Sequence, residues 1–101
     1  MFYVYIIYSP DFDRYYVGHT YDVQKRLFQH NNDPRTNKHT SKFRPWKIAK
    51  SFPVNETRGD AMKIEYYIKR MKSRKVIVKL IDNPEYFFEI AQLARVPICR
   101  D

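Results

Sequence analysis

Cysteine and glycine are scarce in this chain of 101 residues, which contains one Cys and two Gly. The single cysteine, Cys99, has no partner for an internal disulfide, and no Cys/His cluster has the spacing of a zinc site. This cysteine usage is typical of a reducing compartment, so we expect a cytoplasmic protein.

Long apolar runs are absent as well. The longest, residues 2–8, is about a third of the ~20 residues that a membrane-spanning helix needs. It has no basic segment before it and no small-residue cleavage site after it, which argues against a signal peptide. The sequence therefore predicts a protein that is not inserted in a membrane.

Acidic residues are also few relative to basic ones. The chain has 19 Lys and Arg against 11 Asp and Glu, a net charge of +8. Such an excess favours a polyanionic partner, nucleic acid first and an anionic membrane surface second. The apolar fraction of 44% is enough for a small core, and the length suits one domain.

Three strands are predicted from the pattern of apolar and aromatic residues. Residues 2–8 are rich in β-formers at every position, which indicates a strand buried on both faces. The turn sequence SPDFDR separates them from residues 15–20, so the first twenty residues predict a β-hairpin. Residues 46–52 alternate between two faces and predict a third strand.

Helices are predicted in between and after these strands. Asp22 suits the N-cap of a helix ending near residue 31, and residues 57–72 carry an apolar stripe at helical spacing. Ser73 suits the N-cap of a shorter helix, and residues 83–95 predict a last one with Pro84 at its first position. Residues 31–45 are interpreted as a basic loop. The order β-β-α-β-α-α with an additional C-terminal helix predicts a small α+β domain with an antiparallel sheet.

Several polar residues stand out as candidates for chemistry. Tyr5 and Tyr16 lie on neighbouring predicted strands, and each phenol can donate or accept a hydrogen bond. Arg26 and His30 are four residues apart and share a helix face. Gly18 has no side chain, which allows a backbone or a phosphate to come close. Taken singly, each of these residues also has an ordinary structural interpretation.

Glu65 borders the apolar stripe of the long helix, where an unpaired carboxylate is expensive. Two explanations remain open from spacing alone. Lys69, one turn later, is a suitable ion-pair partner. Alternatively, one carboxylate with water and substrate phosphates is a common way to hold Mg²⁺. His19 and His39 lack partners at ligand spacing, so we expect them to contact phosphate or transfer protons rather than bind metal.

The ordered set of motifs resembles the GIY-YIG nuclease family, and in particular its small stand-alone UvrC-like members. YVY at residues 3–5 and YVG at residues 16–18 are followed by Arg26, His30 and Glu65. The resemblance covers residues 1–81. It implies a three-stranded antiparallel sheet flanked by helices and metal-dependent cleavage of phosphodiester bonds in nucleic acid.

The resemblance also implies roles for individual residues. Tyr5, Tyr16, Arg26, His30 and Glu65 match the catalytic positions, and Glu65 matches the ligand of one Mg²⁺ or Mn²⁺ ion. The chain departs from the family pattern in two places. Tyr3 replaces the glycine of the first motif, and Ile77 stands where some members have asparagine.

We therefore predict a divalent-metal-dependent endonuclease, with DNA favoured over RNA and a role in repair or recombination. The rival hypothesis is a nucleic-acid-binding module that kept the fold and lost turnover. Residues 82–101 are expected to form a helical tail packed on the same domain, and the sequence is compatible with a homodimer. The residues predicted to contact nucleic acid are His19, Arg35, Lys38, His39, Lys42, Arg44 and Lys69.

Overall fold

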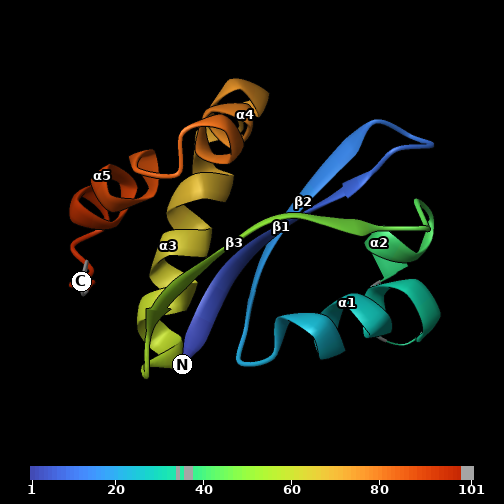
Figure 1. Ribbon diagram of the computed structural model, residues 1–101, viewed down its shortest axis with the longest axis horizontal. Coiled ribbons are helices and arrows are strands. Elements are labelled where there is room, and N and C mark those ends of the chain that lie inside the picture. The colour runs from blue at the N-terminus through green and yellow to red at the C-terminus, as the bar shows by residue number, and fades with distance from the viewer. Residues whose placement is uncertain (34, 36–37, 99–101) are drawn as a thin grey trace.

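Three antiparallel strands form one sheet with the order β2-β1-β3 (Figure 1). The computed structural model describes residues 1–33, 35 and 38–98. The strands are β1 (Phe2–Ser9), β2 (Arg14–Thr20) and β3 (Lys47–Asn55). The helices are α1 (Val23–Asn32), α2 (Lys38–Ser41), α3 (Arg58–Met71), α4 (Arg74–Asp82) and α5 (Tyr86–Leu93). The predicted α+β class and the three-stranded antiparallel sheet are confirmed.

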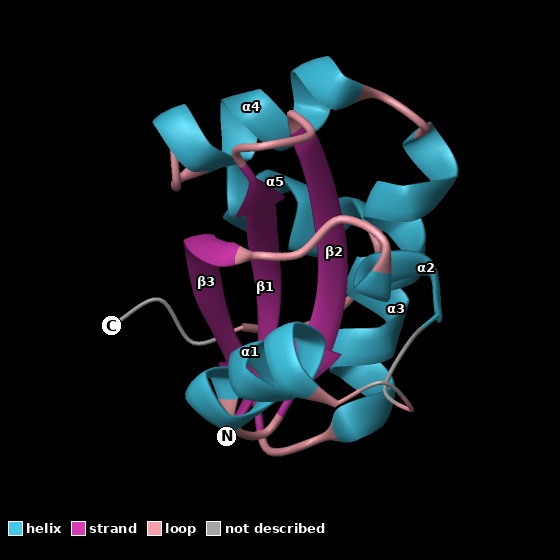
Figure 2. Ribbon diagram, turned by 90° about the vertical axis from the view of Figure 1, so that its right-hand side faces the viewer, coloured by secondary structure: helices cyan, strands magenta, loops and turns pink. Residues whose placement is uncertain are grey.

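Helices cover both faces of this sheet (Figures 1 and 2). Val4 and Ile6 of β1 pack with the apolar stripe of α3 and with residues of α4 and α5. Tyr5 and Ile7 point to the opposite face, where they pack with Trp46 and with Leu27 of α1. The central strand is therefore buried on both faces, as its continuous apolar run predicts.

Side chains cap two of the helices where the sequence predicts it. The Asp22 carboxylate accepts a hydrogen bond from the Lys25 backbone N–H at the start of α1. The Ser73 hydroxyl accepts one from the Val76 N–H at the start of α4. These bonds satisfy backbone donors that the first turn of a helix leaves unpaired.

The third strand differs from its prediction because its pairing with β1 is irregular. Ile48 pairs with Ile7, but Lys50 pairs with Ile6, so Ala49 is an extra residue in β3. Such a bulge breaks the strict alternation of side chains. Trp46 and Phe52, which alternation assigns to one face, therefore pack in different cores. The strand also continues past the predicted end, to Asn55.

Two other predicted boundaries are wrong. The predicted loop over residues 31–45 includes α2, in which Thr40 is buried because its side chain and backbone bond to α1 and to Trp46. The last helix begins at Tyr86 rather than near Asn83, because Asn83 closes α4 and Pro84 lies in the turn between the two helices.

The α5 helix contributes to the main core. The Phe87 ring stacks on the Phe52 ring of β3, with centroids 4.3 Å apart and an angle of 2° between the planes. Ile90 and Ala91 are buried in the same core. Cys99 and the end of the predicted tail lie outside the described residues. Among the helices of the described part, none is long and apolar enough to cross a membrane.

Replacing the stacked ring should test whether α5 belongs to the folding unit. Phe87→Ala should lower the free energy of unfolding by about 3 kcal/mol or more, because a large buried ring is removed and a cavity remains. Leu93→Ala, on the same helix but 59% exposed, should change it by less than about 1 kcal/mol. Urea denaturation of both variants measures the difference. Equal effects would show that α5 packs independently of the sheet.

Candidate active site

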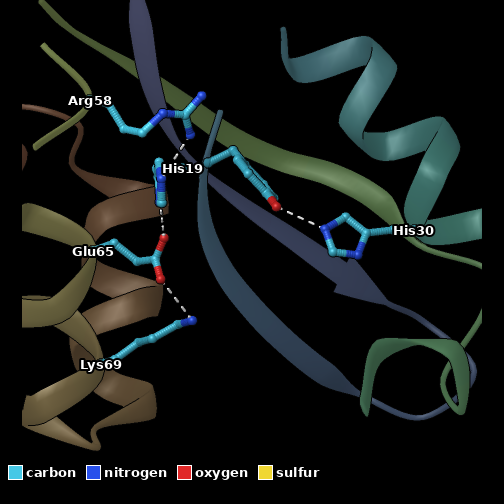
Figure 3. A network of polar contacts seen from close by, with 6 residues as sticks. His19, His30, Arg58, Glu65 and Lys69 are labelled. Atoms are coloured by element: carbon cyan, nitrogen blue, oxygen red, sulfur yellow. Dashed lines mark hydrogen bonds and ion pairs between the residues drawn. The ribbon is translucent and has the colours of Figure 1, made fainter. Parts of the chain in front are cut away.

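The candidate residues gather along β2, which is an edge strand of the sheet. Because α1 and α3 cover opposite faces, side chains from both layers can meet beyond this edge. Tyr5 and Tyr16 come from the face under α1, and His19 points to α3. Figure 3 shows how His30 approaches from the α1 side while Glu65 and Lys69 approach from α3.

The Tyr5 side chain crosses β2 over Gly18. These two residues are direct partners in the β1–β2 ladder, and Tyr16 is opposite Ile7 instead. A methyl group at position 18 would overlap the ring and hydroxyl of Tyr5. The space beside Gly18, predicted for a backbone or phosphate, is therefore filled by the phenol itself.

The Tyr5 hydroxyl lies at one end of a buried chain of hydrogen bonds. Its oxygen lies 2.8 Å from His30 Nε2, and His30 Nδ1 lies 3.0 Å from Thr40 Oγ1. Arg26 also acts on the Tyr5 hydroxyl, where its guanidinium lowers the phenol pKa and can only donate to the oxygen. The phenol proton is therefore assigned to the bond with His30 Nε2, which places the imidazole proton on Nδ1, facing Thr40.

Burial shifts both ends of the Tyr5–His30 bond toward their neutral forms. Desolvation raises the pKa of Tyr5 to about 12, although the hydrogen bond and charge of Arg26 act in the opposite direction. Desolvation lowers the pKa of His30 to about 4, and the charges of Arg26, Arg44 and Lys69 add to this effect. At neutral pH the pair consists of a protonated phenol and an uncharged imidazole.

Glu65 of α3 forms the second polar group of the site. Its Oε1 lies 2.7 Å from His19 Nδ1, and its Oε2 lies 3.0 Å from Lys69 Nζ. Arg58 Nη1 lies 3.3 Å from the other ring nitrogen of His19. The ion pair with Lys69, one of the two explanations left open for this carboxylate, is thus present, and the Glu65 side chain is 19% exposed.

Lys69 connects the two groups. Its ammonium lies 4.6 Å from the centroid of the Tyr16 ring while it also contacts Glu65. The Tyr16 ring in turn lies edge-on to His30, with centroids 5.3 Å apart. The charge of Glu65 contributes to raising the pKa of Tyr5, so this carboxylate lies within electrostatic reach of the phenol. The five predicted catalytic residues therefore converge on one region.

A polar hollow of about 640 Å³ opens at the end of β2 that carries His19. Lys25, Arg26 and Arg58 line it and come from α1 and α3. Arg26 donates to Gln29 Oε1 at 3.1 Å, which holds the guanidinium at this opening. An anionic chain can reach Arg26 through this hollow and meet positive charge on both sides.

The predicted nucleic-acid contacts have several environments. Lys38 and Lys42 are exposed, and the His39 ring packs on Phe43. Arg35 is exposed and pairs with Asp33. Arg44 turns inward, donating to the His30 carbonyl at 2.5 Å and to the Asp33 carbonyl at 2.7 Å. Arg44 is thus used within the fold, where it binds carbonyls at the C-terminal end of α1.

Sequence reasoning missed Thr40 and Arg58. Thr40 holds the far side of the His30 ring, and Arg58 contacts His19. Neither lies in a recognisable motif, and both contacts join segments that are distant in the chain. Only the packed structure brings them to the site.

The candidate site offers one carboxylate, that of Glu65, as a ligand for a metal ion. The described residues contain no group of three or more His, Cys, Asp or Glu side chains that could hold a metal. Glu65 is partly exposed and its oxygens face basic side chains. This donor set fits Mg²⁺ or Mn²⁺ held mainly by water and substrate phosphate, and it does not fit a closed structural site.

Comparison with known proteins gives two matches. The chain matches the GIY-YIG catalytic domain over residues 1–77. It is also 34% identical over 83 residues to a "UPF0213 protein" of Syntrophus aciditrophicus (strain SB), covering 82% of this chain and 93% of that protein. No solved structure gives a significant match. The matched domain includes every member of the candidate site, from Tyr5 to Lys69.

The two glycines of the chain provide a matched test of the Tyr5 position. Gly18→Ala should lower the free energy of unfolding by about 1–3 kcal/mol, because the added methyl overlaps the phenol. At Gly59 in α3 an added methyl would make only an ordinary van der Waals contact with Thr57, so Gly59→Ala should raise it by up to about 1 kcal/mol. Urea denaturation distinguishes the two. A stabilised Gly18→Ala protein would contradict the observed position of Tyr5.

The His30 environment predicts how stability depends on pH. Its pKa is about 4 in the folded protein and about 6.5 in an unfolded chain. Between these values the unfolded state binds more protons, so the free energy of unfolding should fall by about 3 kcal/mol as pH drops from ~6.5 to ~4.

Urea denaturation at several pH values, compared with His30→Gln, isolates this contribution from that of the carboxylates. In His30→Gln this fall in the free energy of unfolding should be absent, whereas His39→Gln should show the same fall as the wild-type protein. An NMR titration of the His30 ring with a midpoint near pH 6.5 would contradict the assignment.

Proposed function

The chain belongs to the GIY-YIG family of nucleases, and we propose that this member is an endonuclease that hydrolyses phosphodiester bonds with one divalent ion. The observation that carries the proposal is the convergence of Tyr5, Arg26 and Glu65 on one strand edge from three different elements. Phosphodiester hydrolysis needs a positioned nucleophile and neutralised phosphate charge, and these residues are suited to supply both.

Arg26 is the proposed phosphate ligand. Its guanidinium lines the polar hollow and also reaches the Tyr5 hydroxyl, so a phosphate bound there would lie next to the phenol. The planar fork of donors suits two oxygens of one phosphate. Lys25 and Arg58 line the same hollow and would hold neighbouring phosphates without reading sequence.

The pKa values decide how Tyr5 could act as a base. At pH 7, forming a free phenolate from a group of pKa about 12 costs about 7 kcal/mol, whereas protonating an imidazole of pKa about 4 costs about 4 kcal/mol. In a relay, Tyr5 takes a proton from the attacking water while its own proton passes to His30 Nε2. No free phenolate forms in this route.

His30 itself cannot be the direct base. Its side chain is fully buried, and both ring nitrogens are occupied, by Tyr5 and by Thr40. Burial also lowers the pKa of His30 to about 4, so its imidazole is a weaker base than an ordinary histidine. Its proposed role is to orient the phenol and to receive the proton that Tyr5 releases.

Glu65 would hold the divalent ion, with water and substrate oxygens as the other ligands. Bound there, the ion would supply charge neutralisation at the phosphate and the leaving oxygen. Lys69 and His19 contact the same carboxylate and orient its two oxygens toward the β2 edge. Tyr16 packs against Lys69 and His30 and would keep these two side chains apart.

We propose DNA rather than RNA as the substrate and a single domain that includes α5. The net charge of +8 and the two-sided basic hollow support a nucleic-acid ligand. The Phe52–Phe87 stack supports the inclusion of α5. A nucleic-acid-binding module without turnover remains the rival function, and the following experiment separates the two.

Cleavage of supercoiled plasmid and branched DNA should require Mg²⁺ or Mn²⁺ and should stop on adding a chelator. Tyr5→Phe and Glu65→Gln should each reduce the rate by at least about 100-fold, because a proton acceptor or the metal ligand is lost. Both variants should still bind DNA, since the basic hollow is intact. Binding by the wild-type protein with no cleavage under any metal would support the module instead.

A further inference from the structure

A second hollow of about 470 Å³ lies at the other end of the β2 edge, near the tip of the β1–β2 hairpin. Tyr16 and Lys69, which belong to the candidate active site, also line this hollow. It is thus continuous with the site through shared side chains. Its other walls come from the hairpin tip, the segment after α2, and the corner between α3 and α4.

Aromatic rings form one wall of this hollow. Phe12, in the hairpin turn, is 49% exposed, and its ring lies edge-on to that of Phe43 at 5.3 Å. The Arg14 guanidinium covers the Phe43 ring at 4.4 Å. A half-exposed phenylalanine in a turn adds little to the core, but its open face offers a flat apolar surface.

Basic side chains form another part of the lining. Lys69, Lys72 and Arg74 come from α3, its C-cap and the first turn of α4. Asp13 is the one acid among the described residues that line the hollow, and Arg74 pairs with it at 2.6 Å. The hollow therefore combines an aromatic surface with an excess of positive charge.

We propose that this hollow is a nucleobase-binding subsite, in which the exposed Phe12 ring, braced edge-on by Phe43, stacks against one unpaired base while Lys69 and Lys72 hold its phosphates. The inference rests on the proposed function, because it assigns the ligand to the same nucleic-acid strand. An aromatic ring beside cations suits a nucleotide, because the base can stack on the ring and the anionic phosphate can bind the cations. An apolar peptide has no anionic group that could pair with these cations.

The spacing along α3 fits this assignment. Lys69 and Lys72 follow Glu65 by four and seven residues, which corresponds to about 6–10 Å along a helix. Successive phosphates of a DNA strand are about 3.4 Å apart along the duplex axis and farther apart when the strand is extended. The stacked base would therefore belong to a nucleotide within about three positions of the cleaved bond.

Binding can be tested separately from cleavage. We suggest fluorescence anisotropy in metal-free buffer with a labelled oligothymidylate of about twelve nucleotides, and with an abasic strand of the same length and charge. Wild-type protein should bind the thymidine strand at least about fivefold more tightly than the abasic one. Phe12→Ala should remove most of this difference and leave binding of the abasic strand unchanged.

Three variants complete the test. Phe12→Tyr should retain the difference because it keeps a ring, whereas Phe12→Leu should lose it. Phe28→Ala is the matched control, since Phe28 is 66% exposed on α1 and does not line the hollow. Equal loss with Phe28→Ala, or equally weakened binding of both strands by Phe12→Ala, would overturn the subsite. If the protein binds the thymidine strand more tightly than the abasic strand but never cleaves DNA, the subsite is supported and the proposed endonuclease activity is contradicted.

Discussion

The contact of Tyr5 with Gly18 and His30 is the constraint on which the site depends. The phenol can reach His30 only because Gly18, its partner in the ladder, has no side chain. The same burial that fixes the hydroxyl also keeps it protonated and keeps the imidazole neutral. The Tyr5 hydroxyl is thus well positioned but difficult to ionise. Its O–H points to His30 Nε2, because the other ring nitrogen of His30 is bonded to Thr40.

The two-layer arrangement explains how side chains from two separate helices reach one site. Arg26 and His30 come from the helical layer under one face of the sheet, and Glu65 and Lys69 from the layer under the other. They meet only beyond the edge of β2. An edge strand is otherwise prone to pairing with another chain. Here basic and aromatic side chains border it, which suits a strand of nucleic acid.

Much of this could be predicted from the sequence, and the remainder has identifiable causes. The hairpin, the Asp22 and Ser73 caps and the stripe of α3 depend on local patterns, so periodicity and cap chemistry predict them. The β3 bulge depends on pairing with β1, and the inward turn of Arg44 depends on where α1 ends. The ordered motifs identified the candidate residues, but the direction of both pKa shifts required the burial that packing creates.

We propose that the Tyr5 proton passes to His30 during cleavage. The most direct measurement is single-turnover cleavage by His30→Gln at saturating protein. Glutamine can still hydrogen-bond to the phenol but cannot accept its proton at neutral pH. We expect unchanged DNA binding and a cleavage rate at least about 100-fold below wild type. A rate within a few-fold of wild type would show that His30 only positions Tyr5 and that the proton leaves by another route.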